Sequence, residues 1–110
     1  MASESFARIR AQVLELTAQV PYGRVTTFHA IGAHIAVAPR HVAFLLVKLS
    51  EEEKSRLPWY RVVADGGLVP SSKTEQRQLL AAEGAKFAQA RIVDFARRFV
   101  AMGALAQKRR

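Results

Sequence analysis

Two short helices separated by a four-residue break restrict the fold of this chain more than any other feature. Thr26 or Thr27 can cap a helix over residues 28–35, because a threonine hydroxyl accepts a backbone N–H of the first turn. A further helix begins at Pro39 or Arg40, since proline is favoured in a first turn. Two helices joined in this way form a helix-turn-helix pattern, in which the second helix contacts DNA. The same pattern also occurs in many small helical domains without that function.

The helix that begins at Pro39 has an apolar stripe and an open face. The stripe consists of Val42, Leu45, Leu46 and Leu49, and the other side carries Arg40, His41, Phe44 and Lys48. Helices that read base edges in the major groove need Asn, Gln or Arg along their length. Apolar residues dominate here instead. A winged-helix transcription regulator that reads DNA sequence is therefore an alternative interpretation, against which this composition counts.

A β-hairpin is expected beyond these helices. The stretch over residues 58–63 reads PWYRVV and holds the one tryptophan of the chain, Trp59. Proline and the valine run favour extended backbone, so we predict a strand over residues 60–64. Residues 65–67, DGG, then form a turn into a return strand over 68–69, which would be the wing of a winged helix. Taken alone, Trp59 is more simply interpreted as a core or interface aromatic.

Helices are predicted on both sides of this unit. Spacings of three and four predict a first helix capped by Ser3 or Ser5, with the apolar residues Phe6, Ile9, Val13 and Leu16. Residues 50–56 are interpreted as a solvated helix end or loop. Ser72 and Glu75 have capping-box spacing for another helix that ends at Gly84. Residues 92–102 suggest an amphipathic helix, with a strand over 91–95 as the alternative.

Taken together, these patterns predict one domain that is mainly α with a small β-hairpin, a winged helix-turn-helix-like fold. We expect this single domain to occupy residues 1–110, with a core over about 5–95 and a basic C-terminal segment over about 96–110. The net charge of +8 favours a polyanionic partner. Residues 91–110 carry six basic and one acidic side chain. Much of the excess charge therefore lies near the C-terminus, where a solvated tail is an equally good interpretation of residues 108–110.

The chain contains no cysteine, which excludes disulfides, thiolate metal ligands and a cysteine nucleophile. His29 and His34 do not share a helix face and His41 lies on another element, so we expect no metal site and no cofactor. No leader-like N-terminus or membrane-length apolar run is seen. We therefore expect a soluble cytoplasmic protein, nucleoid-associated in a bacterium or nuclear in a eukaryote, without a membrane partner.

Four separated motifs, in order, resemble the DNA-binding domain of the O6-alkylguanine-DNA alkyltransferases. They are residues 21–28 (PYGRVTTF), 39–40 (PR), 58–63 (PWYRVV) and 79–84 (LLAAEG). In those enzymes the third motif reads Pro-Cys-His-Arg-Val, and its cysteine accepts the alkyl group. Trp59 stands in the place of that cysteine here. This replacement defines the alkyltransferase-like proteins, which bind alkylated guanine in DNA without repairing it and are associated with nucleotide excision repair.

The resemblance implies that no catalytic residue is left. Tyr60 matches the histidine that activates the cysteine, and Leu49 matches a catalytic asparagine. Glu83 matches the glutamate that orients the histidine and is retained, as a helix-end acceptor or the partner of a basic group. The resemblance therefore implies a protein that is not an enzyme. An alkyltransferase or glycosylase with an unusual nucleophile is the enzymatic alternative.

The resemblance also implies which residues bind DNA. Arg40 matches an arginine finger that enters the minor groove and fills the gap left by an extruded nucleotide, and Phe28 matches a tyrosine that helps rotate that nucleotide. Further DNA contacts are expected from Thr27, His41 and Phe44. The implied lesion pocket is formed by Pro58, Trp59, Tyr60, Val63, Ser72 and Lys73.

The function implied is a non-enzymatic sensor that flips and binds O6-alkylguanine in duplex DNA and flags it for nucleotide excision repair. Its expected partners are double-stranded DNA containing the lesion and excision-repair proteins, and we expect a monomer.

Overall fold

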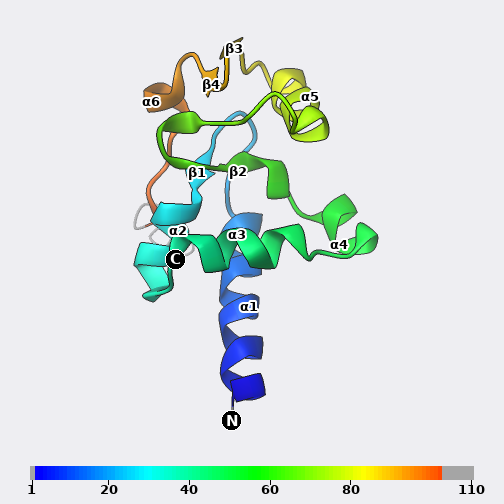
Figure 1. The fold of residues 1–110 in the computed structure, drawn as a ribbon, viewed down its shortest axis with the longest axis vertical. Helices are drawn as coiled ribbons and strands as arrows, with labels where there is room; N and C mark the ends of the chain where they lie inside the picture. Colours follow the sequence, from blue (N-terminus) through cyan, green and yellow to red (C-terminus); the bar gives the residue numbers. More distant parts are fainter. Residues whose placement is uncertain (1, 103–110) are drawn as a thin grey trace.

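The structure is a computed structural model that describes residues 2–102, with side chains from residue 5 onward. Six helices lie along this part of the chain (Figure 1): α1 (Ala2–Ala18), α2 (Phe28–Ile35), α3 (Pro39–Val47), α4 (Glu51–Arg56), α5 (Thr74–Ala82) and α6 (Phe95–Arg98). The short strands are β1 (Thr26–Thr27), β2 (Val62–Val63), β3 (Phe87–Ala88) and β4 (Arg91–Ile92). Two 3-10 turns, η1 (Trp59–Arg61) and η2 (Asp65–Gly67), complete the described elements. The prediction of a mainly helical fold with a small hairpin is confirmed.

The helices α2 and α3 have the geometry of a helix-turn-helix. Their directions differ by 113°, within the range of about 90–120° found in that motif. Thr27 caps α2, since its hydroxyl oxygen accepts a 2.9 Å hydrogen bond from the N–H of Ala30. Ala36 ends α2 in the left-handed region, and Pro39 opens α3 as predicted. Local capping chemistry therefore fixes both ends of the break between the helices.

The predicted strand over residues 60–64 is wrong in its extent and in its partner. Pro58 begins a tight turn in which its carbonyl accepts a 3.0 Å hydrogen bond from Arg61, so residues 59–61 form η1. Only β2 is extended, and it pairs in parallel with β1 rather than with a return strand. The expected wing is reduced to an antiparallel bridge between Ala64 and Leu68 around η2. The regular hairpin is formed by β3 and β4 instead.

The predicted helix over residues 92–102 is confirmed only over α6, Phe95–Arg98, and the alternative strand over residues 91–95 is confirmed only over Arg91–Ile92. Backbone groups that a continuous helix would pair internally are hydrogen-bonded to a neighbouring segment instead. Val25 donates to the carbonyl of Arg98 at 2.8 Å and accepts from Val100 at 2.9 Å. Of the basic C-terminal segment, residues 103–110 lie outside the described residues.

Capping was misassigned at two helices and missed at a third. α1 begins at Ala2, so Ser5 lies within the helix rather than at its cap. α5 begins at Thr74 after Lys73, and no side-chain cap is formed there, so the capping box expected from Ser72 is wrong. A capping box is present instead at α4, where Ser50 and Glu53 exchange hydrogen bonds of 3.0 and 3.1 Å.

The region that we interpreted as a solvated helix end or loop is therefore the helix α4. It is joined to α1 because both carboxylate oxygens of Glu53 accept 2.7 Å hydrogen bonds from Arg10.

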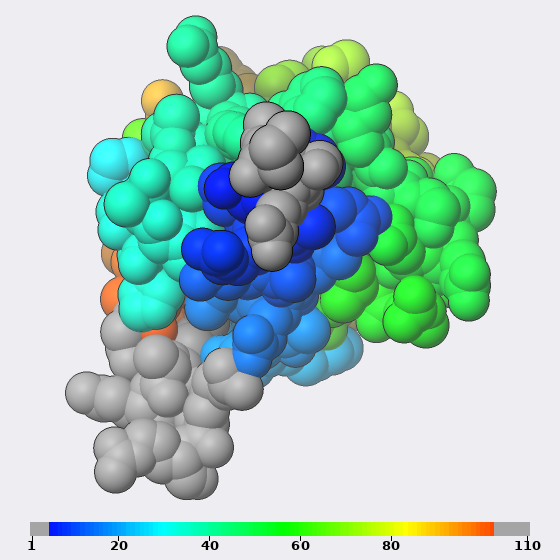
Figure 2. Space-filling model, turned by 90° about the horizontal axis from the view of Figure 1, so that it is seen from below, coloured from blue at the N-terminus to red at the C-terminus, as the bar shows by residue number. Residues whose placement is uncertain are grey.

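Two hydrophobic clusters lie on either side of the β1–β2 pair. The lower cluster joins α1, α2 and α3 and includes Val62, whereas the upper cluster joins α5 and β4 and includes Val63. Successive side chains of a strand point in opposite directions, so β2 contributes one valine to each cluster. Seen from below, α1 (blue) lies between α2 (cyan) and the green helices α3 and α4 (Figure 2).

Among the described residues, no single helix is long and apolar enough to span a membrane. The bent pair α2 and α3 reaches that length and composition only when taken together.

Gly32 of α2 packs closely against the backbone of the break between α2 and α3, which leaves no room for a side chain. A Cβ at this position would lie 2.2 Å from the backbone oxygen of Val37. We therefore expect Gly32→Ala to lower the free energy of unfolding by about 2 kcal/mol, since a backbone atom must move. Urea unfolding followed by circular dichroism measures this, with Ala33→Ser on the exposed side of α2 as the control. Equal midpoints for wild type and Gly32→Ala would contradict the packing described here.

Candidate functional site

Trp59 lies at the start of η1, between the two halves of the molecule. Its ring packs against the lower hydrophobic cluster, whereas the next residue, Tyr60, packs against the upper one. The two rings meet edge to face, with centroids 5.9 Å apart and planes at 89°. This orientation is favourable for aromatic pairs. The 3-10 turn thus directs two adjacent aromatic side chains to different parts of the structure.

A cavity of about 500 Å³ lies beside Trp59, and most of the predicted lesion pocket lines it. Trp59, Val63, Ser72 and Lys73 are all in its wall. Phe28, predicted as a DNA contact, lines the same cavity from the start of α2. Its volume is in the range of about 300–1,000 Å³ typical of small-molecule sites. The structure therefore brings residues from four separate segments around one space.

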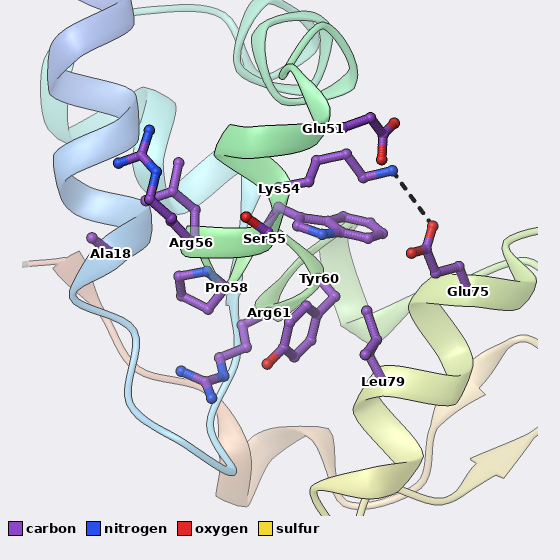
Figure 3. Close-up of a pocket in the computed structure, with 12 residues that line it drawn as sticks. Ala18, Glu51, Lys54, Ser55, Arg56, Pro58, Tyr60, Arg61, Glu75 and Leu79 are labelled. Carbon is purple, nitrogen blue, oxygen red and sulfur yellow. Dashed lines mark hydrogen bonds and ion pairs between the residues drawn. The ribbon is translucent and has the colours of Figure 1, made fainter.

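Pro58 and Tyr60, which were predicted for the same pocket, line a different cavity. That second cavity, of about 610 Å³, lies on another side of Trp59 and is lined by charged side chains from α4 and α5 (Figure 3). Trp59 borders both cavities. Pro58 and Tyr60 are separated from the first cavity because η1 turns the chain at that point.

Arg40 lies beside the first cavity, at the N-terminus of α3. It lines a shallow hollow of about 340 Å³ together with Phe28 and His29. This hollow shares four lining residues with the first cavity: Phe28, Ala43, Ala64 and Leu68. The exposed guanidinium predicted to act as a finger is thus next to the predicted pocket.

The other predicted DNA contacts differ in accessibility. Phe44 is 50% exposed, and the ammonium of Lys48 lies 5.5 Å from its ring centroid. Thr27 is 5% exposed, with its hydroxyl used as the cap of α2. His41 is half-buried, and its ring lies 6.2 Å from that of Phe6 on α1. The open face of α3 is therefore formed by Arg40, Phe44, Val47 and Lys48.

Two residues that border Trp59 were not found from the sequence. The ammonium of Lys54 lies 4.8 Å from the centroid of the Trp59 ring and 3.4 Å from a carboxylate oxygen of Glu75. Both side chains line both cavities. In the sequence, Lys54 belongs to a charged stretch that suggests a solvated connection, and Glu75 has the spacing of a helix cap. The two residues are far apart in the sequence, so no local pattern predicts their contact.

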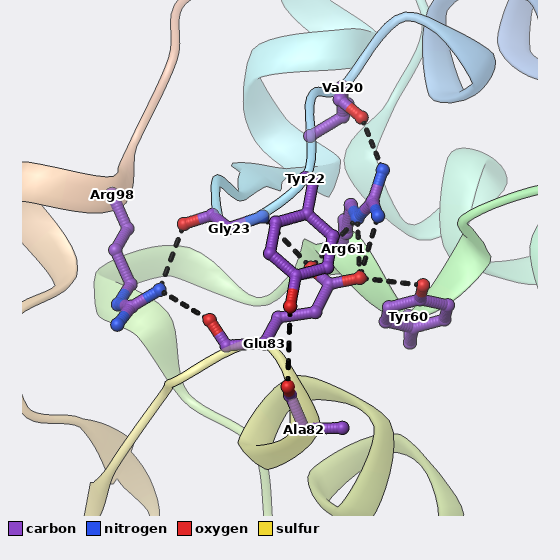
Figure 4. A network of polar contacts seen from close by, with 8 residues as sticks. All are labelled: Val20, Tyr22, Gly23, Tyr60, Arg61, Ala82, Glu83 and Arg98. Carbon is purple, nitrogen blue, oxygen red and sulfur yellow. Dashed lines mark hydrogen bonds and ion pairs between the residues drawn. The ribbon is translucent and has the colours of Figure 1, made fainter.

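Glu83, directly after α5, is the centre of a polar network that includes Tyr60 and Arg61 (Figure 4). Its carboxylate accepts hydrogen bonds from Tyr60 Oη at 2.8 Å, from the backbone N–H of Gly23 at 3.0 Å and from Arg61 at 2.6–3.2 Å. Arg61 also donates to the carbonyl of Val20 at 2.8 Å. The side chains of Arg61 and Glu83 are only 13% and 7% exposed. The expectation that Glu83 partners a basic group is confirmed.

This network changes the acidity of its members. Burial opposes ionisation of Glu83, but the hydrogen bonds from Arg61, Gly23 and Tyr60 outweigh it and lower its pKa. Burial raises the pKa of Tyr60, and its hydrogen bond to Glu83 raises it further. The tyrosine hydroxyl is therefore a neutral donor to Glu83 near pH 7.

No group of three or more acidic, histidine or cysteine side chains that could hold a metal ion occurs among residues 2–102. His29 and His34 are exposed on α2, and His41 faces α1. The prediction that the protein uses no metal stays a prediction.

The fold and the site define a small helix-turn-helix domain whose second helix borders a cavity walled by a tryptophan. Residues 8–85 match the family described as 6-O-methylguanine DNA methyltransferase, DNA binding domain, and the chain belongs to this family. Within it, the absence of cysteine and the presence of Trp59 make this chain an alkyltransferase-like member. No curated protein matched the sequence.

Two solved structures from S. pombe share the fold. One is Atl1 in complex with damaged DNA containing O6-carboxymethylguanine, with a TM-score of 0.67, 23% identity, and coverage of 76% of this chain and 82% of that one. The other is ATL in complex with DNA, with a TM-score of 0.74, 19% identity, and coverage of 86% of this chain and 95% of that one. At these identities the likeness concerns the fold.

The buried pair of Glu83 and Arg61 predicts a pH-dependent loss of stability in Glu83→Gln. Removing one charge of a buried pair leaves the other uncompensated, so we expect a loss of about 3 kcal/mol near pH 7. The folded state lowers the pKa of Glu83 below its ordinary value of 4.5, so its contribution is present above that value and is lost as pH falls through the folded pKa.

Urea unfolding at a series of pH values measures this effect. The gap between wild type and Glu83→Gln should be constant above about pH 5 and shrink at lower pH. Glu52→Gln, at an exposed carboxylate of α4, is the matched control. A gap that grows as pH falls would contradict the assignment.

Proposed function

We propose that this protein is a non-enzymatic DNA-damage recognition protein that flips O6-alkylguanine out of duplex DNA, binds it, and flags it for nucleotide excision repair. The observation that carries the proposal is Trp59. This indole stands in the acceptor position of the family and lines a cavity of about 500 Å³ next to Arg40. The S. pombe Atl1 complex with damaged DNA supports the same reading.

The cavity has the chemistry to hold a flipped base. Phe28 and Trp59 provide aromatic walls, and Val63 and Leu68 add apolar surface. Stacking of a base on an aromatic side chain contributes about 1–3 kcal/mol. An alkyl group on O6 adds apolar surface to the base. Burial of that surface beside the indole is favourable. Lys73 and Gln76 place polar groups in the same wall.

We propose that Arg40, at the N-terminus of α3, replaces the extruded nucleotide. Unstacking a base pair costs a few kcal/mol, which an inserted guanidinium offsets in part by stacking and hydrogen bonding. Phe44, Val47 and Lys48 continue the open face of α3 from Arg40. A face with apolar and basic residues suits insertion against the duplex better than base-edge reading in a major groove.

The same site lacks the groups needed to remove the alkyl group. The chain has no cysteine, and the indole of Trp59 offers no comparable nucleophile. Tyr60 donates its hydroxyl proton to a hydrogen bond with Glu83 and is not positioned in the first cavity. Leu49 is buried in the lower hydrophobic cluster. We therefore propose that recognition ends in a stable complex, and that excision-repair proteins act on that complex.

Lesion selectivity is the first expected outcome. A duplex with one O6-methylguanine should bind at least tenfold more tightly than its unmodified twin at the same salt concentration, because only the lesion gains from the pocket. Fluorescence anisotropy with labelled duplexes measures both affinities. Equal affinities would contradict the damage-recognition proposal.

The same mixtures, analysed by mass spectrometry after stoichiometric incubation, should retain the methyl group on DNA. Loss of the methyl group would contradict the non-enzymatic proposal.

Arg40→Ala is expected to weaken binding of the O6-methylguanine duplex by about tenfold or more, because the gap in the duplex is no longer filled. The charge-matched control is Arg8→Ala, at an exposed position of α1. Both variants lose one positive charge, so the same anisotropy titration separates insertion from a general effect of charge. Similar losses in the two variants would remove Arg40 from the flipping mechanism.

A further inference from the structure

Lys54 and Glu75 point toward each other in one of the cavities (Figure 3), and together with Trp59 they line both cavities. The ammonium of Lys54 lies over the Trp59 ring, 4.8 Å from its centroid. A carboxylate oxygen of Glu75 lies 3.4 Å from the same ammonium, reaching it from α5. These three residues line both the cavity of about 500 Å³ and the cavity of about 610 Å³.

Their location places a positive charge where the substituent on O6 is expected. An acceptor at position 59 must reach the carbon attached to O6, so the proposed function directs that substituent toward Trp59. Lys54 is the ammonium that lies directly over this ring. Lys73 lines the first cavity but not the second, so it is not at the boundary that a longer substituent would meet.

We propose that Lys54 is a specificity-determining residue that binds anionic O6 substituents, such as a carboxymethyl group, and that Glu75 competes with the substituent for it. The proposal rests on the proposed function of this site as a binder of O6-alkylguanine. It adds a preference by charge: a carboxylate on the adduct takes the place of Glu75 beside the ammonium of Lys54.

The existing ion pair is weak enough to be exchanged. The side chain of Glu75 is 65% exposed, and exposed pairs contribute little because water and salt screen them. The side chain of Lys54 is 27% exposed and keeps its contact with the indole. A carboxylate held against it inside the cavity would be less solvated than Glu75, so its interaction with the ammonium is stronger.

The test compares four duplexes that are identical except at one guanine. The guanine is unmodified, O6-methylated, O6-carboxymethylated or O6-carbamoylmethylated, and the last of these is a neutral amide close in shape to the carboxylate. Anisotropy titrations at fixed salt and pH 7.5 are made with wild type, Lys54→Met, Glu75→Gln and Lys86→Met. Lys86, exposed at the upper hairpin and outside these cavities, is the charge-matched control.

The measured quantity is the ratio of affinities for the carboxymethyl and carbamoylmethyl duplexes. We expect Lys54→Met to lower this ratio by about tenfold and Glu75→Gln to raise it roughly threefold, since the two charges act in opposite directions. Lys86→Met should leave the ratio unchanged. The ratio is not affected by a general loss of affinity in Lys54→Met, because such a loss applies equally to both duplexes.

An unchanged ratio in Lys54→Met, or equal reductions in Lys54→Met and Lys86→Met, would overturn the role of Lys54. A loss of affinity in Lys54→Met that is the same for the carboxymethyl and carbamoylmethyl duplexes would also overturn it, because the residue would then support the pocket and not read charge. Failure of the proposed function is a separate result: wild type would bind all four duplexes equally.

Discussion

The carboxylate of Glu83 joins the segments on which the position of Trp59 depends. It accepts hydrogen bonds from Tyr60 and Arg61 of η1 and from Gly23 of the loop before β1. Arg98 extends the same junction, because it donates to the carbonyls of Gly23 and Gly84 at 2.9 and 2.8 Å and to Asp94 at 2.9 Å. The strands are only two residues long, so these side-chain hydrogen bonds, rather than an extended sheet, hold η1 in position.

The two adjacent aromatic residues of η1 have separate roles because the turn directs them to different sides. Tyr60 faces the upper cluster and completes the hydrogen bonding of Glu83, whereas Trp59 borders the cavities. In an alkyltransferase the matching positions cooperate in chemistry, with a histidine activating a cysteine. In this chain Tyr60 is hydrogen-bonded to Glu83, and Trp59 lines both cavities. Glu83 here accepts hydrogen bonds from Gly23, Tyr60 and Arg61.

The sequence was sufficient for the parts that depend on local chemistry. Thr27 as a cap, Pro39 in a first turn and the stripe from Val42 to Leu49 all act within a few residues, and each was predicted correctly. The wing was predicted wrongly and the C-terminal helix was predicted too long, because distant partners decided them. β2 pairs with β1, and the backbone of Val25 forms hydrogen bonds with Arg98 and Val100. The site followed the same rule. Trp59, Val63, Ser72 and Lys73 do line one cavity, but Lys54 and Glu75 meet only through tertiary packing.

The most direct test of whether Trp59 binds a flipped base is its own fluorescence, since it is the one tryptophan of the chain. Emission is followed during titration with an O6-methylguanine duplex and with an unmodified duplex, each taken to saturation. Stacking of the lesion on the indole predicts strong quenching with the first duplex and little change with the second, although both are bound. Equal quenching by the two duplexes, or none by either, would contradict an account in which the indole at the acceptor position receives the damaged base.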